Sequence, residues 1–118
     1  MKIAVTSQNR KSITEHAGRC RKFWVFVAEN NKIVDRELLE LPKEQAFHES
    51  SPHDPHPLDD IDVLIAGGLG QGLVMRLAQK GIKGLVTKES DPEKAVLLYL
   101  NGSLESEQPN QHHHGHNR

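Results

Sequence analysis

A short apolar strand that runs directly into a glycine-rich turn constrains the fold of this chain more than any other feature. Residues 62–66 read Asp-Val-Leu-Ile-Ala, and residues 67–72 read Gly-Gly-Leu-Gly-Gln-Gly before a helical pattern begins. A strand that is apolar on both faces predicts a central strand of a sheet that helices cover on both sides. The glycines permit a tight turn and a close backbone approach at the carboxyl end of that strand, where open α/β sheets place their sites.

Periodicity and turn signals extend this strand to a sheet with two helices. Apolar and β-branched residues predict five strands, at residues 2–6, 22–29, 33–41, 62–66 and 82–87. Helical spacing and capping residues predict helices at about residues 73–80 and 92–100. Asn30-Asn31 suits a tight hairpin because asparagine tolerates the left-handed backbone that such turns need. We therefore expect an α/β fold with a mixed sheet, in which the first, fourth and fifth strands are parallel and an antiparallel hairpin extends them.

Composition limits the class of protein. The 118 residues are 36% hydrophobic and 26% charged, with a formal net charge of -1, which is typical of one ordinary domain. No apolar run approaches the ~20 residues of a membrane span, and the first residues lead into a strand without the anatomy of a signal peptide. No basic stripe points to nucleic acid as a partner. We expect a cytoplasmic protein whose domain covers residues 1–102, followed by a disordered, histidine-rich tail at residues 103–118.

One loop after the first strand holds His16 and the single cysteine, Cys20. Imidazole binds iron, copper and zinc, and thiolate binds softer metals and iron-sulfur clusters, so the loop could present both groups together. The alternative is an exposed or capping histidine with a small buried cysteine, which is the commoner arrangement for isolated residues of these types. The pair could also act as nucleophile and base, but no third orienting group stands at a recognisable place, so we do not expect an enzyme.

The other histidines form two clusters. His48, His53 and His56 lie within nine residues of a proline-stiffened loop, where they could converge on one metal ion or simply form a solvated polar loop. Four more stand in the last seven residues, a composition that binds divalent metals loosely: His112, His113, His114 and His116. Gly115 and the closing Asn117-Arg118 argue for a native tail, since a vector tag is usually an uninterrupted run.

The glycine-rich turn is a candidate anion site. The backbone amides of Gly67, Gly68 and Gly70 precede the following helix, and free N–H groups and the helix dipole favour anions at a helix N-terminus. The order of the glycines lacks the spacing of a dinucleotide fingerprint and the Lys-Ser/Thr ending of a nucleotide P-loop. A tight strand-to-helix turn without a ligand explains the glycines at least as well.

Several of these pieces occur together in one known family. The chain opens with Lys-Ile-Ala-Val-Thr, has His-Ala-Gly-Arg at residues 16–19 and Asp-Val-Leu-Ile-Ala-Gly-Gly-Leu-Gly at residues 62–70, and has Gly81-Ile82 before the last strand. Its final helix contains Glu-Lys-Ala-Val and Tyr-Leu. In this order and spacing the pieces resemble the dinitrogenase iron-molybdenum cofactor biosynthesis family, the small domain of NifX- and NafY-like nitrogenase accessory proteins that is also fused to some NifB proteins. The resemblance covers residues 1–104.

The resemblance implies a three-layer, ribonuclease H-like α/β domain without nuclease activity, which holds an iron-sulfur-based cofactor during nitrogenase assembly. The family's His-Phe-Gly motif falls on His16, Ala17 and Gly18, which implies His16 as the cluster ligand. Two departures stand out: Ala17 replaces the customary aromatic residue, and a short loop at residues 47–57 replaces the helix that many members carry before the central strand. Molybdenum itself does not follow, because many members occur outside nitrogen fixation.

We therefore expect a non-catalytic carrier for an iron-sulfur or iron-molybdenum-type cluster, with metallocofactor assembly proteins as its partners. His16 would bind iron with Cys20 as a further ligand, and Arg19 with the amides of residues 67–72 would offset the negative charge of the cluster. One or two protein ligands suit a cluster that must be passed on. The alternative is a regulatory domain that binds an assembly protein and no metal. The edge position of the third strand predicts a monomer or a weak homodimer.

Overall fold

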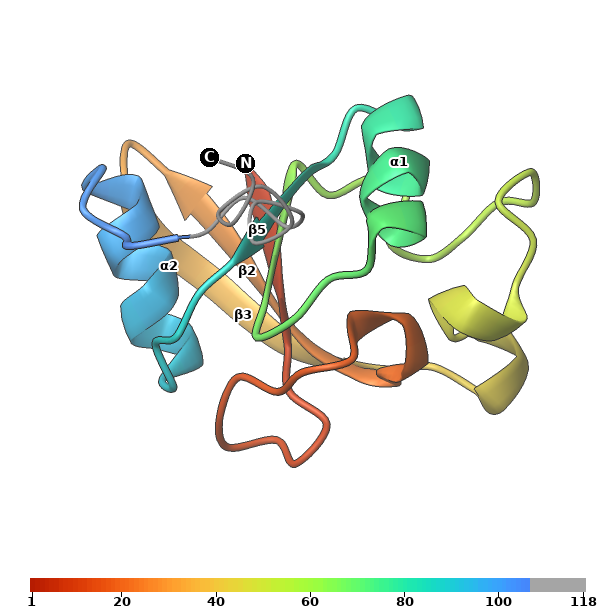
Figure 1. Cartoon of the computed structure of the whole chain (residues 1–118). Coiled ribbons are helices and arrows are strands. Elements are labelled where there is room, and N and C mark those ends of the chain that lie inside the picture. Colours follow the sequence, from red (N-terminus) through yellow and green to blue (C-terminus); the bar gives the residue numbers. More distant parts are fainter. Residues whose placement is uncertain (107–118) are drawn as a thin grey trace, which may run out of the picture.

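Five strands form one mixed sheet in the order β3-β2-β1-β4-β5 (Figure 1). The computed structural model describes residues 1–106. Its strands are β1 (Lys2–Thr6), β2 (Lys22–Glu29), β3 (Lys32–Glu40), β4 (Val63–Ala66) and β5 (Lys83–Val86). Its helices are α1 (Gln71–Gln79) and α2 (Pro92–Leu100), and three short 3₁₀ turns are η1 (Ala17–Arg19), η2 (Lys43–Gln45) and η3 (Phe47–Glu49).

The strand directions match the expected mixed sheet. β1 runs parallel to β4 and β4 runs parallel to β5, whereas β2 is antiparallel to both β1 and β3. The expected α/β fold with a mixed five-stranded sheet is therefore confirmed. Because β1, β4 and β5 are parallel, their carboxyl ends meet at the same edge of the sheet, which is where open α/β sheets place their sites.

The hairpin between β2 and β3 forms where two asparagines permit it. Asn30 has φ 53° and Asn31 has φ 63°, and a tight hairpin turn needs this left-handed backbone at both central positions. The pairing shifts register beside Val27, and β3 is the outer strand. A bulge and charged side chains such as Arg36 and Glu37 are features that discourage pairing at a sheet edge. The oligomeric state stays a prediction.

The two helices cover opposite faces of the sheet. All four residues of β4 are buried, as expected for a strand that is apolar on both faces. Leu64 packs in one core with Leu77 of α1, while the adjacent Ile65 packs in a second core with Val96 of α2. Consecutive residues of a strand point to opposite faces, so this alternation gives three layers, with α1 and α2 on either side of the sheet (Figure 1).

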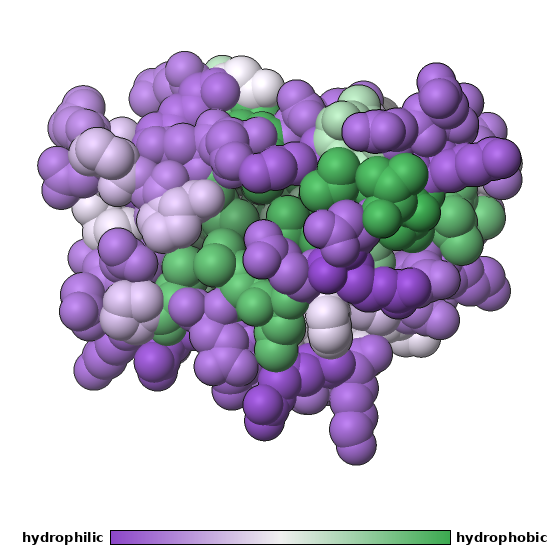
Figure 2. Space-filling model, turned by 180° about the vertical axis from the view of Figure 1, so that it is seen from behind, coloured by the Kyte–Doolittle hydropathy of each residue, from purple (hydrophilic) through white to green (hydrophobic). Residues whose placement is uncertain are grey.

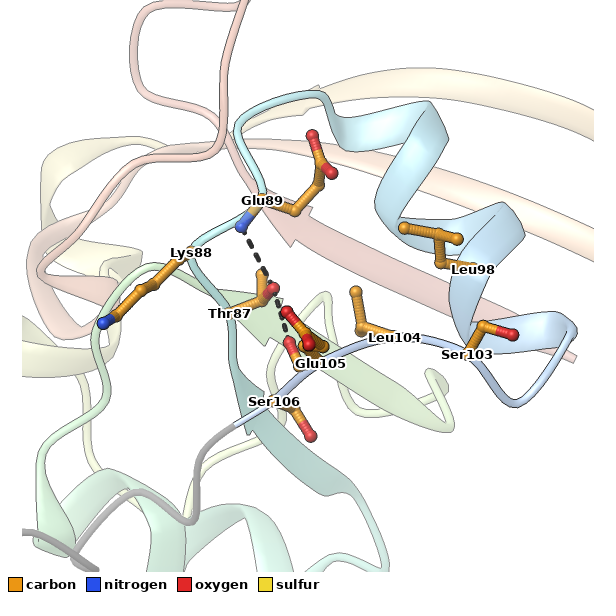
Figure 3. A pocket seen from close by; sticks show the side chains of 8 residues that line it. All are labelled: Thr87, Lys88, Glu89, Leu98, Ser103, Leu104, Glu105 and Ser106. Carbon is orange, nitrogen blue, oxygen red and sulfur yellow. Dashed lines mark hydrogen bonds between the residues drawn. The ribbon is translucent and has the colours of Figure 1, made fainter.

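The chain after α2 lies against the end of β5 (Figure 3). Thr87 Oγ1 donates to the carbonyl oxygen of Glu105 at 2.9 Å, and the amide of Ser103 donates to the carbonyl oxygen of Leu98 at 2.8 Å. Leu104 is half-buried against the core on the α2 side. Residues 103–106, which the sequence assigns to the tail, are thus in contact with the domain. The tail histidines at residues 112–116 lie outside the described residues.

One face of the molecule carries both polar and apolar side chains. Figure 2 shows the face turned away from the viewer in Figure 1, where apolar side chains gather in a band between polar ones. The exposed large apolar side chains of the described residues are Met1, Val34, Met75 and Leu97. Among residues 1–106, no helix is long and apolar enough to cross a membrane.

Candidate functional site

The loop between β1 and β2 crosses the carboxyl ends of the parallel strands. The amide of Thr14 donates to the carbonyl oxygen of Thr6 at 3.0 Å, and the carbonyl oxygen of Thr14 accepts from the amide of Gly67 at 3.0 Å. The amide of Ala17 donates to the carbonyl oxygen of Gly68 at 3.3 Å. These hydrogen bonds bring together the two segments that the sequence singles out, the loop of His16 and the glycine-rich turn.

Gly67 is required because two backbone segments approach closely here. A Cβ atom at this position would lie 3.1 Å from the carbonyl oxygen of Thr14 and 3.2 Å from Cγ of Glu15. At Gly68 the nearest atoms to such a Cβ, which include the amide nitrogen of His16, are 3.7 Å away. The first glycine therefore allows the contact, and the second lies directly beside His16.

His16 stands at the start of η1 in a left-handed backbone conformation. Its φ is 61° and its ψ is 55°, and its side chain is exposed and makes no capping hydrogen bond to the turn. A residue other than glycine adopts this conformation at a cost of about 1–2 kcal/mol, so surrounding contacts must hold it. The outcome is an accessible imidazole side chain on a constrained turn next to Gly68.

Cys20 does not accompany His16 at the surface. It is 3% exposed, belongs to the core on the α1 side, and its thiol donates to the carbonyl oxygen of Lys22 at 3.0 Å. Burial raises the pKa of the Cys20 thiol. The structure therefore places a neutral, buried thiol where the sequence allowed either a metal ligand or a small core residue.

The histidines of the loop between β3 and β4 do not converge. His48 and His53 are exposed, whereas His56 is buried and its ring stacks on Phe47 with centroids 4.5 Å apart. Nδ1 of His56 accepts from the amide of Leu58 at 3.0 Å, so Nε2 carries the proton and donates to the carbonyl oxygen of Gln45 at 2.7 Å. Both nitrogens of this ring are therefore engaged. Within residues 1–106, no three His, Cys, Asp or Glu side chains are grouped to hold a metal ion.

His56 makes the stability of the protein depend on pH. Burial lowers the pKa of His56. The unfolded chain, with a pKa of about 6.5, takes up its proton first as the pH falls, so the free energy of unfolding should be highest above this value and decrease below it. One proton accounts for at most about 1.4 kcal/mol per pH unit.

Urea unfolding at pH 7.5 and pH 5.5 tests this dependence. The free energy of unfolding should decrease less on acidification for His56→Gln than for the wild type. The exposed-site variant His53→Gln should lose as much as the wild type, and equal losses in all three proteins would contradict this assignment.

Arg76 of α1 anchors residues 47–51 of the loop between β3 and β4. This role of Arg76 was not predicted from the sequence. Its terminal nitrogens donate to the carbonyl oxygens of Phe47, Ser50 and Ser51 at 2.7, 3.1 and 3.2 Å and to Oγ of Ser50 at 3.0 Å. Its guanidinium carbon lies 5.1 Å from the centroid of the Phe47 ring. The sequence does contain one indication of this role. Arg76 stands three residues after Leu73, which places a cation on the apolar face of the helix.

The glycine-rich turn leaves the start of α1 without a side-chain cap. Gly70 is the N-cap residue and has no side chain to cap the helix, so among residues 1–106 the first amides of the helix lack the side-chain acceptor that a capping residue supplies. The amide of Gly67 is different, because it already donates to the loop of His16. The amides that face an anion would thus be those after Gly67.

Comparison with known proteins decides the family. The sequence model of the dinitrogenase iron-molybdenum cofactor family matches residues 1–102. The chain belongs to this family. The resemblance that the residues predict is therefore confirmed, and residues 16–19 and the glycine-rich end of the second motif, residues 67–70, lie at the carboxyl edge of the sheet.

The chain is similar to other proteins over most of its length. An uncharacterised protein of Methanocaldococcus jannaschii is 26% identical over 107 residues, which are 89% of this chain and 90% of the relative. A solved structure of a candidate dinitrogenase from the same organism is 14% identical with a TM-score of 0.68, covering 92% of this chain and 96% of that one. The apo form of the orange protein from Desulfovibrio gigas is 20% identical with a TM-score of 0.66, covering 92% and 93%. At these identities the two structures show the shared fold.

Proposed function

We propose that this protein is a non-catalytic carrier that binds an iron-sulfur or iron-molybdenum-type cluster and passes it between metallocofactor assembly proteins. The observation that carries the proposal is the juxtaposition of the exposed His16 turn with Gly68 and the uncapped start of α1. Family membership supports the class of cargo. The ribonuclease H-like topology and the cytoplasmic location that we expect from the sequence belong to the same proposal.

The available side chains suit a preassembled cluster better than a bare metal ion. A bare ion needs three or four protein ligands, and the described residues group no such set. A cluster brings its own sulfides, so one imidazole from His16 can complete the coordination of one iron. Arg19 and the amides at the start of α1 would offset its negative charge. A single protein ligand also allows the cluster to be released.

The position of Asp62, just before the central strand β4, argues against nuclease activity. Asp62 precedes β4, at the end of the strand opposite to the glycine-rich turn, and its carboxylate accepts from the amide of Lys2 at 2.8 Å. A nuclease of this fold class would need several carboxylates at one place to bind its metal ions. The position of Asp62 favours a structural role in joining β1 to the start of β4.

Loss of cluster binding on substitution of His16 tests the proposal. The protein would be titrated anaerobically with a synthetic iron-sulfur cluster that carries exchangeable thiolates, with the tail histidines His112, His113, His114 and His116 replaced by glutamine. His16→Asn should weaken binding by about 10-fold to 100-fold, measured by visible absorption. Asparagine tolerates the left-handed backbone, so the turn should be retained.

The matched control replaces a histidine that is equally exposed but lies elsewhere. His53→Asn should bind the cluster as the parent protein does. Equal binding by the parent, His16→Asn and His53→Asn, or binding by none of them, would reject the carrier proposal. The second candidate, a regulatory domain that binds an assembly protein without metal, predicts that none of the three binds the cluster.

A further inference from the structure

A cavity of about 320 Å³ lies beside η1, and Arg19 is the one lining residue to which the proposed function assigns a role. It is formed where three separate segments meet, which are η1, the residues just before β2, and the turns η2 and η3. Its lining residues are Arg19, Arg21, Lys43, Ala46, His48 and Glu49.

The lining of the cavity carries more positive than negative charge. Arg19, Arg21 and Lys43 contribute three cations, and Glu49 is the single acidic residue in the lining. Within the described part of the chain, none of these three cations forms an ion pair. A concave surface with an excess of one sign of charge focuses the field, and an anion would relieve the mutual repulsion of the three cations.

Arg21 is held in place by the base of the hairpin. Its amide donates to Oε1 of Gln8 at 2.8 Å, its carbonyl oxygen accepts from the amide of Leu41 at 2.7 Å, and its Nε donates to the carbonyl oxygen of Leu41 at 3.0 Å. These bonds use Nε, and no other described residue of the chain occupies the two terminal nitrogens of the guanidinium, which are therefore available to a ligand. A fixed guanidinium fork matches two oxygens of a phosphate-like anion.

The opposite wall of the cavity is also supported. A Cβ built on Gly18 would lie 3.8 Å from Cβ of His48, so η1 and η3 are in close contact. The carbonyl oxygen of Phe47 in the same turn accepts from Arg76 at 2.7 Å. The cations therefore stand on segments that are anchored to the hairpin and to α1.

We propose that this cavity binds a dianionic tetrahedral oxyanion of the phosphate, sulfate or molybdate class. The bidentate fork of Arg21 and the point charge of Lys43 would hold the oxyanion, with Arg19 at the side that faces the cluster site. The site does not depend on the imidazole of His16, so it extends the proposed function without resting on it.

Titration of the isotope-labelled full-length chain with sodium phosphate, sulfate and molybdate at constant ionic strength and pH 7.5 tests this proposal. Amide NMR shifts should centre on the segments that line the cavity. Lys43→Gln and Arg21→Gln should each weaken binding by about tenfold or more, since a charge-assisted hydrogen bond is lost. Lys83→Gln removes an exposed cation of β5 and should change the affinity less than twofold.

Two control variants, His16→Asn and Lys83→Gln, keep the outcome decisive. Arg21→Gln could unfold the base of the hairpin, so Lys43→Gln, whose side chain is exposed, decides the test. His16→Asn should retain oxyanion binding even though it loses the cluster, so the two proposals can fail separately. Saturable binding of any of the three anions supports the proposal and shows which oxyanion the site prefers. Binding of none of them, binding of only an acidic peptide, or equal effects of Lys43→Gln and Lys83→Gln would overturn it.

Discussion

Gly67→Ala is expected to destabilise the protein by about 1–3 kcal/mol, the usual range for an added methyl group in a closely packed place. The new Cβ would lie 3.1 Å from the carbonyl oxygen of Thr14 and 3.2 Å from Cγ of Glu15. The backbone cannot yield without lengthening the hydrogen bond from the Gly67 amide to Thr14. We therefore also expect weaker cluster binding, because the same loop carries His16.

Gly72→Ala is the matched control, because it adds the same methyl group five residues later. This glycine lies in the first turn of α1, where a Cβ would meet no atom within 4 Å. Alanine at a helical position should stabilise the protein by up to about 1 kcal/mol. Urea unfolding measures both changes. A loss of stability in both variants, or in neither, would show that the close approach at Gly67 is not what requires a glycine.

Arg76→Met is expected to cost about 2–4 kcal/mol and to loosen the segment at residues 47–51. The substitution removes four hydrogen bonds from a cation to that segment, and bonds to charged groups contribute about 1.5–3 kcal/mol each before compensation. A methionine side chain would still pack against Phe47, so the expected loss of stability is smaller than the summed contributions of the four hydrogen bonds. Amide hydrogen exchange should accelerate at Glu49 and Ser50, whose N–H groups bond within the segment.

Arg36→Met provides the comparison for Arg76→Met. Arg36 is an exposed cation on β3 that pairs with Glu93 of α2. An exposed pair of this kind contributes at most about 1 kcal/mol. A similar loss of stability for both variants, with unchanged exchange at Ser50, would mean that Arg76 does not anchor the segment.

The sheet is predictable from the sequence because its signals are local. Two asparagines mark the hairpin, and a short apolar run followed by glycines marks β4 and the turn into α1. Asp91 caps the last helix, as its position just before Pro92 indicates, and its carboxylate accepts from the amides of Glu93 and Lys94 at 3.0 and 3.3 Å. Each feature depends on neighbours within a few residues, so a single sequence contains the information.

The roles of individual side chains are harder to predict because they depend on distant contacts. Three histidines in one loop suggest a common ligand set, yet His56 stacks on Phe47 and bonds the backbone on both sides of its ring. The contact between Gly67 and Thr14 joins residues 53 positions apart, and Arg76 reaches back to Phe47, 29 positions earlier. No spacing rule covers such pairs. The placement of Cys20 in the core illustrates the same limit.

Residues 47–51 are anchored by helix α1 rather than by the sheet, and this affects which sequence changes the fold can tolerate in the loop between β3 and β4. The hydrogen bonds of residues 47–51 run to Arg76 and to neighbouring residues of the same loop, so these five residues do not set the register of any strand. Insertions and deletions there would leave the ladder intact, because the entropy of closing a longer surface loop rises only slowly with its length. We therefore expect that residues 47–51 can be exchanged for the corresponding residues of a homologous protein without changing the sheet. Such an exchange would alter the shape of the neighbouring cavity and the selectivity of that cavity for its ligand.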